Sequence, residues 1–164
     1  MTKLKILTLG NPILKKKSKA IKKITPDIKK LIKDMTETLH AAPGVGLAAP
    51  QVGQSVRLIL VDVGEGLTVL INPKLTKKSG KQEMIEGCLS LPGLRAPIER
   101  YAHIFVEGLN RSGEKVKIEA HGLFSTVIQH EMDHLDGILC IDRVKDPSTI
   151  IFEPFEISSK EPNL

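Results

Sequence analysis

One short stretch, residues 129–137, constrains this chain more than any other. It contains His130, Glu131 and His134 in the pattern His-Glu-x-x-His. Residues four apart lie on one face of an α-helix, so both imidazoles can bind the same cation. Glu131 lies beside the first histidine, where it can act as general base on a water at that cation. The alternative is a helix with two surface histidines and an unrelated glutamate.

An earlier segment predicts a second helix. Residues 25–27 are Thr-Pro-Asp, which supply an N-cap, a proline at the first helical position and an acidic group at the positive end of the helix dipole. Apolar residues recur at helical spacing from Ile28 to Leu39, and the Pro-Gly pair at 43–44 cannot continue the helix. We therefore expect an amphipathic helix over residues 25–42, packed on a core.

The rest of the chain is typical of short strands. Apolar, β-branched runs separated by turns predict strands at residues 56–63, 67–71, 98–109 and 115–120, and an exposed strand pair at 74–84. Asn72-Pro73 is expected to end one strand, and residues 86–93 contain too much glycine and proline for regular structure. Residues 122–135, ended by Gly137, form the helix with the histidines. We expect an α+β fold: several short antiparallel strands around a central metal-bearing helix, plus the N-terminal amphipathic helix.

Length and charge limit the partners. The 164 residues suffice for one domain, so we expect a single catalytic domain over residues 1–164, with an atypical extended tail at 144–164. Aromatic residues make up only 3%, which argues against stacking platforms for single-stranded nucleic acid. The net charge of +5 comes largely from lysines in the first thirty residues. A solvated face is the favoured interpretation, and a basic surface for RNA or the ribosome is the alternative.

The cysteines and the N-terminus predict the compartment. The chain has two cysteines far apart in sequence, which fits a reducing environment rather than a disulfide framework. The first ten residues lack a long apolar core and a small-residue cleavage site, and no run approaches the roughly 18 apolar residues of a membrane span. We expect a soluble, cytoplasmic protein without a membrane partner.

Two histidines need a third ligand, because catalytic zinc-type sites take three protein ligands and keep one position open. The candidates are His40, His103, His121, Cys88, Cys140 and the carboxylates. Cys88 is the better candidate, because thiolate and imidazole together suit zinc or ferrous iron. The alternative for Cys88 is a small buried hydrophobe. The residues alone leave these two interpretations evenly balanced.

A glycine-rich stretch, residues 44–53, is open to three interpretations. A phosphate-binding loop is disfavoured, because no Gly-Lys-Ser/Thr and no helix follow it. Small residues could instead let a substrate backbone approach, with Gln51 as a polar group in an apolar wall. The stretch could also be only a tight connection. The loop by itself does not decide between them.

Three segments together resemble the signature segments of peptide deformylases: residues 44–51, 86–90 and 129–135. They stand in the family's order and at similar separations, and residues 72–73 and 141–143 are also similar. The resemblance extends from about residue 5 to residue 143. It departs from the family after residue 143, where no long basic amphipathic helix follows and residues 150–157 are typical of extended chain, which puts tail-mediated docking on the ribosome in doubt.

The resemblance implies a ligand set and a metal. Cys88, His130 and His134 would hold one divalent ion, which in this family is typically Fe2+ in the cell, with Zn2+, Ni2+ or Co2+ able to substitute. Glu131 would be the catalytic acid and base. The amide of Gln51 and the backbone N–H of Leu89 would bind the oxygen that gains charge.

The resemblance also implies the reaction and the substrate. The protein would remove the N-formyl group from the initiator methionine of new polypeptides and release formate, acting on N-formylmethionyl peptides and nascent chains, with ribosome contact left open and no specific nucleic acid. Gly46 and Gly87 would hydrogen-bond the substrate backbone. From their positions we nominate Val45, Leu89, Val127 and Ile128 for the methionine pocket. The rival hypotheses are a metallopeptidase of another class and a non-catalytic module with a structural metal.

Overall fold

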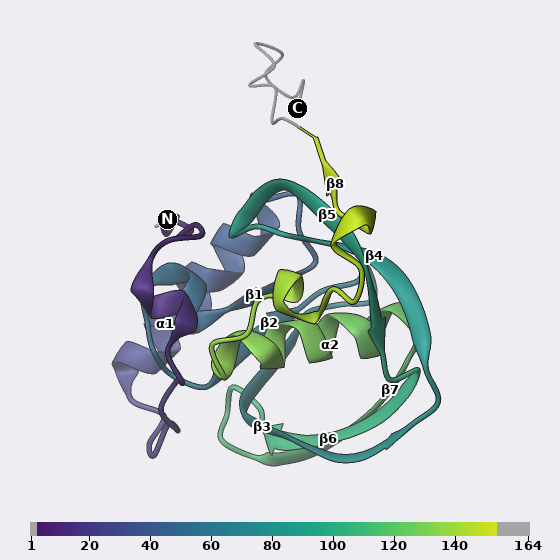
Figure 1. The fold of residues 1–164 in the computed structure, drawn as a ribbon. Helices are drawn as coiled ribbons and strands as arrows, with labels where there is room; N and C mark the ends of the chain where they lie inside the picture. The colour runs from purple at the N-terminus through teal and green to yellow at the C-terminus, as the bar shows by residue number, and fades with distance from the viewer. Residues whose placement is uncertain (1–2, 154–164) are drawn as a thin grey trace.

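Over residues 3–153, the fold consists of two antiparallel sheets and two α-helices (Figure 1). The computed structural model describes residues 3–153, which confirm the α+β class. The helices are α1 (Pro26–His40) and α2 (Gly122–Leu135), with short 3-10 turns η1 (Pro12–Lys15), η2 (Ala49–Val52), η3 (Cys140–Arg143) and η4 (Pro147–Thr149). The strands are β1 (Gly46–Ala48), β2 (Leu58–Val61), β3 (Thr68–Ser79), β4 (Gln82–Cys88), β5 (Leu91–Arg100), β6 (His103–Leu109), β7 (Lys115–His121) and β8 (Ile151–Phe152).

The larger sheet has the strand order β1-β2-β3-β6-β7 and is covered by a helix on each face. In β2, Leu58 and Leu60 belong to the core shared with α1, while Ile59 and Val61 belong to the core shared with α2. Side chains of a strand alternate between faces, so a strand buried on both sides must be apolar throughout. This explains the uninterrupted apolar run that the sequence shows here.

Helix α1 begins at Pro26, with Thr25 as its N-cap. The backbone N–H of Ile28 donates to the Thr25 hydroxyl at 3.3 Å, which satisfies one of the free donors of the first turn. Its apolar stripe, which includes Met35 and Leu39, is buried against the larger sheet. The helix therefore closes one face of the sheet.

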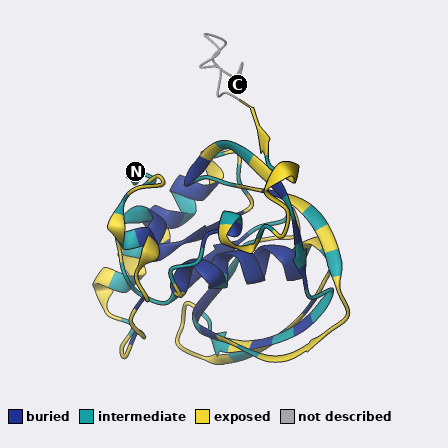
Figure 2. Ribbon diagram, in the orientation of Figure 1, coloured by how far each residue is buried: buried dark blue, intermediate teal, exposed yellow. Residues whose placement is uncertain are grey.

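Helix α2 runs through the middle of the molecule and is buried along most of its length (Figures 1 and 2). Val127, Ile128 and Leu135 pack against the sheet. The chain leaves the helix at Asp136, and Gly137 follows with a φ of 73°. A buried central helix is a rigid support for the polar residues it carries on its other side.

The prediction that Asn72-Pro73 ends a strand is wrong, since β3 continues to Ser79. Asn72 adopts a φ of 52°, and the pairing of β3 with β6 shifts register there. The Asn72 side chain accepts from the Ile21 N–H and donates to the Ile21 carbonyl, both at 2.8 Å. These bonds stabilise a left-handed residue inside the strand, so the chain bulges instead of turning away.

Three other strand predictions are corrected. The exposed pair expected at 74–84 is not a pair, because β3 bonds to β6 while β4 bonds to β5 in the second sheet, whose order is β4-β5-β8. Residues 98–109 are divided between β5 and β6 at positions 101–102. Residues 86–93, expected to be irregular, belong mostly to β4 and β5. Long-range pairing decides all three, and local composition does not reveal it.

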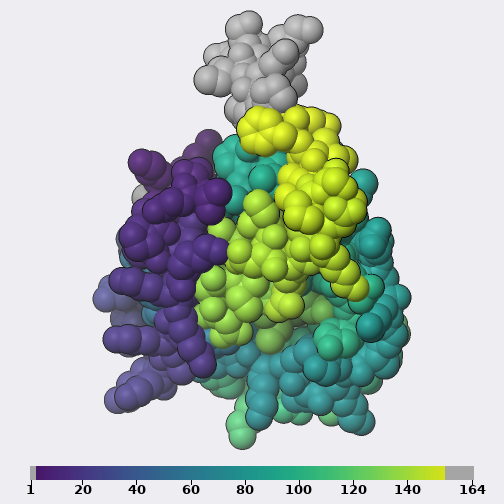
Figure 3. Space-filling view, viewed as in Figure 1, coloured from purple at the N-terminus to yellow at the C-terminus, as the bar shows by residue number. Residues whose placement is uncertain are grey.

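The two ends of the described chain lie on one face of the molecule, where Figure 3 shows them flanking the α2 region. Lys15 Nζ lies 2.8 Å from Asp142 Oδ2, which ties η1 to η3. An extended tail was expected at residues 144–164. Within it, β8 pairs with β5, and residues 154–164 lie outside the described residues. None of the helices between residues 3 and 153 is long and apolar enough to cross a membrane.

Candidate active site

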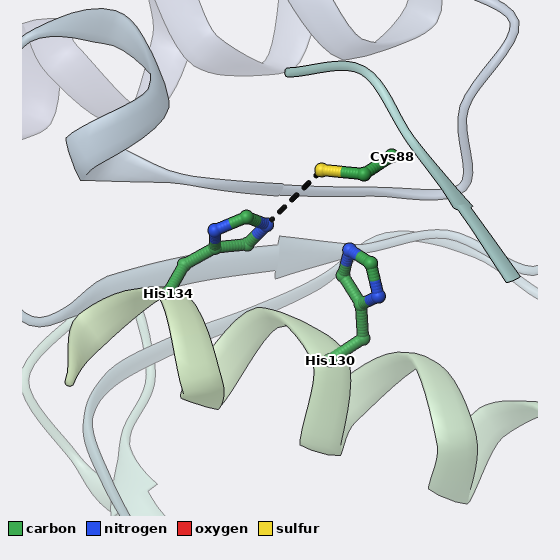
Figure 4. Close-up of side chains that lie close together, drawn as sticks. All are labelled: Cys88, His130 and His134. Carbon is green, nitrogen blue, oxygen red and sulfur yellow. Dashed lines mark hydrogen bonds between the residues drawn. The ribbon is translucent and has the colours of Figure 1, made fainter. Parts of the chain in front are cut away.

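The structure brings Cys88, His130 and His134 together (Figure 4). Cys88 ends β4, and the two histidines lie one turn apart on the side of α2 that faces it. The Cys88 Sγ is 3.4 Å from the His134 Nε2, and the ligand atoms of all three lie within 4.8 Å of one another. One thiolate and two imidazoles at this spacing form a donor set that suits zinc or ferrous iron.

A buried carboxylate orients His130. Glu86 Oε1 lies 2.8 Å from His130 Nδ1, so Nδ1 carries the proton and Nε2 is left for an ion. Arg100 donates to both Glu86 oxygens, at 2.6 and 2.9 Å. The sequence did not point to a role for either residue. Residues 86–93 were expected to be irregular, so strand alternation gave no reason to pair Glu86 with Cys88, and the bulge between Gly87 and Cys88 appears only in the structure.

Asp133, one turn beyond His130 on α2, extends this network. Arg100 Nη1 donates to Asp133 Oδ2 at 2.9 Å, and Arg143 donates to both Asp133 oxygens, at 2.5 and 2.8 Å. The carboxylate therefore lies between two guanidinium groups, one from β5 and one from η3. These bonds fix the rotation of α2 about its axis, and with it the direction of its histidines.

Burial and neighbouring charges shift the pKa values of the site in different directions. Burial acts to lower the pKa of His130, but its bonds with Cys88 and Glu86 outweigh burial and raise the pKa to about 10. Burial acts to raise the pKa of Glu86, and the bonds from His130 and Arg100 reverse that shift to a net lowering. Burial and the neighbouring His130 charge lower the pKa of His134 well below its usual value. The potential that holds a proton on His130 also attracts a metal ion.

Glu131 is buried directly beside the histidines. Its Oε1 lies 4.0 Å from His130 Nε2, and its Oε2 has no hydrogen-bond partner among residues 3–153. His134 Nδ1 is likewise buried without a partner in the described chain. Burial raises the pKa of Glu131 to about 7, although the charges of His130 and Arg100 oppose this. Buried polar atoms that lack a hydrogen-bond partner, next to three potential metal ligands, fit a site that binds an ion and a reactant.

Gln51 is held by both ends of its amide. Its Oε1 accepts from the Ala48 N–H at 2.9 Å, and its Nε2 donates to the Ser90 hydroxyl at 3.1 Å. The same Nε2 lies 3.7 Å from Cys88 Sγ. The amide is therefore a fixed donor at the edge of the ligand cluster. Ser90, which accepts this bond, lies in the signature-like segment 86–90, but the sequence suggested no role for it.

A cavity of about 890 Å3 opens over these residues. Its lining includes the predicted residues Val45, Gly46, Gln51, Gly87, Cys88, Leu89, Val127, His130 and Glu131. Ile128, nominated for the same wall, is fully buried in the core between α2 and the larger sheet, because it lies next to Val127 on the helix and points another way. Ile85 and Leu123, which the sequence did not nominate, line the mouth and are 61% and 50% exposed.

Among the other candidate ligands, Cys140 lies next to the site, because donor atoms of Glu86, His130 and Cys140 are also within 4.8 Å of one another. Burial in the core under the smaller sheet raises the pKa of Cys140 to about 12, which disfavours the thiolate form that binds metals. The remaining histidines lie elsewhere. His40 pairs with Asp62 at 3.1 Å. His103 and His121 lie at paired ends of β6 and β7. A buried cluster of potential metal ligands, a buried glutamate and a cavity beside them define the class, a small α+β hydrolase with a candidate metal centre.

Comparisons with known proteins identify the family. A family model described as polypeptide deformylase matches residues 3–149. A peptide deformylase of Carboxydothermus hydrogenoformans is 51% identical over 143 residues, which cover 87% of this chain and 94% of the relative. One from Acetivibrio thermocellus is 51% identical over 135 residues, covering 82% and 79%. The chain belongs to the polypeptide deformylase family.

Solved structures agree with this assignment. The crystal structure of peptide deformylase from Thermotoga maritima matches with a TM-score of 0.87 and 41% identity, over 89% of this chain and all of that chain. A peptide deformylase from Synechococcus elongatus, solved in complex with actinonin, matches with a TM-score of 0.86 and 38% identity, over 89% and 81%. The family is one of metalloenzymes, which agrees with the donor cluster described above.

Proposed function

We propose that this protein removes the N-formyl group from the initiator methionine of newly made polypeptides and releases formate. One observation carries the proposal: the ligand cluster of Cys88, His130 and His134 lies beside the buried Glu131 in a cavity of about 890 Å3, in a chain of this family. The reaction is hydrolysis of an amide. It needs an activated water, an acid for the leaving amine and a donor to the carbonyl oxygen.

Cys88, His130 and His134 would hold one divalent ion, and Fe2+ is the ion we assign in the cell, with Zn2+, Ni2+ or Co2+ as substitutes. A bound ion of this kind lowers the pKa of water and polarises a carbonyl oxygen. The chain supplies the rest. Glu86 keeps the proton of His130 on Nδ1, and Arg100 holds Glu86 in place. In this proposal, the central helix α2 would be the metal-bearing helix of the fold.

Glu131 is our candidate for the general acid and base. A carboxyl with a pKa of about 7 can take a proton from the attacking water and return it to the leaving nitrogen. Its Oε1 lies on the same side as His130 Nε2, 4.0 Å away, so the proton acceptor is next to the ligand cluster. Burial matters here, because it brings the pKa close to neutral pH.

Gln51 and the backbone N–H of Leu89 are our candidates for stabilising the oxygen that becomes negative. The Gln51 amide is already oriented by Ala48 and Ser90, so it loses no freedom when charge develops. Leu89 lies at the turn between β4 and β5 and lines the same cavity. One such donor lowers the barrier by roughly 3 kcal/mol.

The substrate is proposed to bind as an extended strand. β1 and β4 are edge strands of different sheets, and residues of both line the cavity. An edge strand offers backbone groups to a peptide, and Gly46 and Gly87 lie in these two edges without side chains to block it. Val45, Leu89 and Val127 would surround the methionine side chain. Ile128 is left out, because it does not reach the cavity.

The remaining assignments follow from this role. Residues 1–164 are proposed to act as a single catalytic domain in the cytoplasm, on N-formylmethionyl peptides and nascent chains. The lysines of the first thirty residues form a solvated face in the favoured interpretation. Contact with the ribosome through them is the alternative, and it would place the enzyme near its substrates. No membrane and no specific nucleic acid sequence is needed for the reaction.

A formate-release assay tests the function. The anaerobically purified protein is given a formyl-Met peptide, the same peptide unformylated, and the same peptide N-acetylated. We expect formate from the first and no cleavage of internal bonds in the other two. Cleavage of internal peptide bonds at a similar rate would instead indicate a metallopeptidase. Metal analysis of the same sample should give about one ion per chain, and iron in that sample would support our assignment of the metal.

A further inference from the structure

A second cluster of metal-binding side chains lies on the solvent face of β6 and β7. His103 and His121 are direct partners in the antiparallel register, so their side chains project to the same face. Glu119 precedes His121 by two residues and shares that face. The intervening Ile104 and Ala120 are buried in the core on the other side. The alternation of the strands therefore gathers three donors at one end of the hairpin.

The three donors converge closely. The Nε2 atoms of His103 and His121 lie 2.9 and 3.1 Å from the same oxygen, Oε1 of Glu119. The two rings are stacked, with centroids 3.9 Å apart and planes 17° apart, and all three donor atoms lie within 4.8 Å of one another. Ligand atoms about 2.1 Å from a tetrahedral ion are about 3.4 Å apart, so small side-chain rotations would suffice to admit one.

The charges around the cluster are compatible with a cation. The bonds from His121 and His103 lower the pKa of Glu119, so its carboxylate is ionised at neutral pH. Two lysines lie on the same face, Lys77 and Lys117. Their ammonium nitrogens lie 5.8 and 5.7 Å from the centroid of the Phe105 ring, so both charges sit over this neighbouring aromatic ring.

We propose that His103, Glu119 and His121 form a second metal site, for a borderline divalent ion such as Zn2+, Ni2+ or Cu2+. Two imidazoles and one carboxylate are a donor set that such ions take in proteins. The side chains are 31%, 51% and 65% exposed in that order, so water completes the coordination and the ion exchanges freely. His121 precedes His130 by nine residues, about 14 Å along the helix, so this site is separate from the active site.

The site has a structural consequence, because His121 is the N-cap residue of α2. An ion there would join the start of β6 to the end of β7 and to the entry of α2. The His121 side chain makes no capping hydrogen bond, so it is free to bind an ion without uncapping the helix. A ligand that binds only the folded state raises the melting temperature with its concentration.

Metal counting on the nickel-loaded protein tests the proposal. Zinc is titrated in, unbound metal is removed by brief dialysis at a fixed free-zinc concentration, and total nickel plus zinc per chain is measured. We expect the total to rise from one to two in the wild type. It should stay at one in Glu119→Gln and His121→Ala. The matched control is His40→Ala, which removes an exposed histidine with a carboxylate partner elsewhere and should still reach two.

Formate release and circular dichroism show that each variant is folded, since none of these side chains lines the cavity. A zinc-dependent rise in melting temperature should accompany the second ion and be lost in Glu119→Gln. A total that stays at one in the wild type throughout the titration overturns the proposal. So does a total of two in both Glu119→Gln and His121→Ala, because the second ion would then lie elsewhere.

Discussion

Gly46 of β1 lies against Glu131 of α2 so closely that a methyl group on Gly46 would be 2.6 Å from the Glu131 Oε1. No real Cβ contact is that short, so one of the two must move if Gly46 acquires a side chain. The close approach places the proposed substrate-binding edge of the larger sheet directly beside the proposed proton acceptor. Glycine is needed at this position for space, not for an unusual backbone angle.

Gly46→Ala should therefore displace the Glu131 carboxylate and lower kcat while leaving the metal in place. A displacement of about 1 Å can cost on the order of 10²-fold in rate, and we expect a loss of roughly that size. Steady-state kinetics with metal analysis compares the variant with the wild type. A kcat for Gly46→Ala equal to that of the wild type would count against the steric role of Gly46.

Glu131→Gln keeps the size of the side chain but cannot accept a proton. We expect kcat for formate release to fall by roughly 10³-fold, with about one ion per chain retained, because Glu131 is not a proposed ligand. Gln51→Ala removes a donor to the oxyanion and should cost roughly 10²–10³-fold, again with the ion retained. His134→Ala should differ from both by losing the ion. If Glu131→Gln stayed within about threefold of wild type, another base would be required.

The two cysteines should respond differently to substitution. Cys88→Ser replaces a proposed thiolate ligand by a weakly acidic hydroxyl and should lower metal content well below one per chain. Cys140→Ser changes a buried side chain of the core under the smaller sheet, and it should retain a full equivalent of metal. Metal analysis after identical dialysis compares the two. Loss of the ion from Cys140→Ser alone would contradict the ligand set.

The link between η1 and η3 should depend on pH. Burial acts to raise the pKa of Asp142, but its bonds with Lys15 and the Leu139 N–H outweigh this and lower the pKa below 3.8. Because the folded state holds the proton less tightly than the unfolded state, the stabilisation is present above about pH 4 and is lost as the pH falls through the folded value. Asp142→Asn should be less stable than wild type at pH 7.

Urea unfolding of both proteins from pH 7 down to pH 3 measures this difference, and we expect it to shrink below about pH 4. Lys15→Met should destabilise at pH 7, whereas Lys16→Met, at an exposed neighbour, serves as the control. A constant difference between Asp142→Asn and wild type across the whole pH range would rule out the titration of Asp142 as its cause.

Gly137→Ala should destabilise the fold for two reasons. The residue has a φ of 73°, which costs an L-residue about 1–2 kcal/mol, and its methyl would collide with the backbone carbonyl of Lys15. Gly113→Ala shares the first cost, with a φ of 82°, but meets only the flexible end of Ile24 at 3.1 Å. Thermal unfolding should show a larger drop in melting temperature for Gly137→Ala than for Gly113→Ala. Equal drops would mean that the Lys15 backbone can move aside without destabilising the fold.

Local sequence by itself determined where α1 begins and which residues of α2 could act together. Thr25 and Pro26 set the first turn because capping and a fixed proline φ are properties of a few adjacent residues. The spacing of His130 and His134 puts them on one side of any helix. These features depend on backbone geometry within a turn or two, so no distant part of the chain can alter them.

The tertiary structure decided everything that depends on distant partners. It allowed β3 to continue through Asn72, because the backbone of Ile21, 51 residues earlier in the chain, hydrogen-bonds the Asn72 side chain. It excluded Ile128 from the cavity and placed Glu86 on the His130 Nδ1. Which face of a helix or strand meets a cavity, and which carboxylate meets a ring nitrogen, is set by packing between segments far apart in sequence, and local composition does not record it.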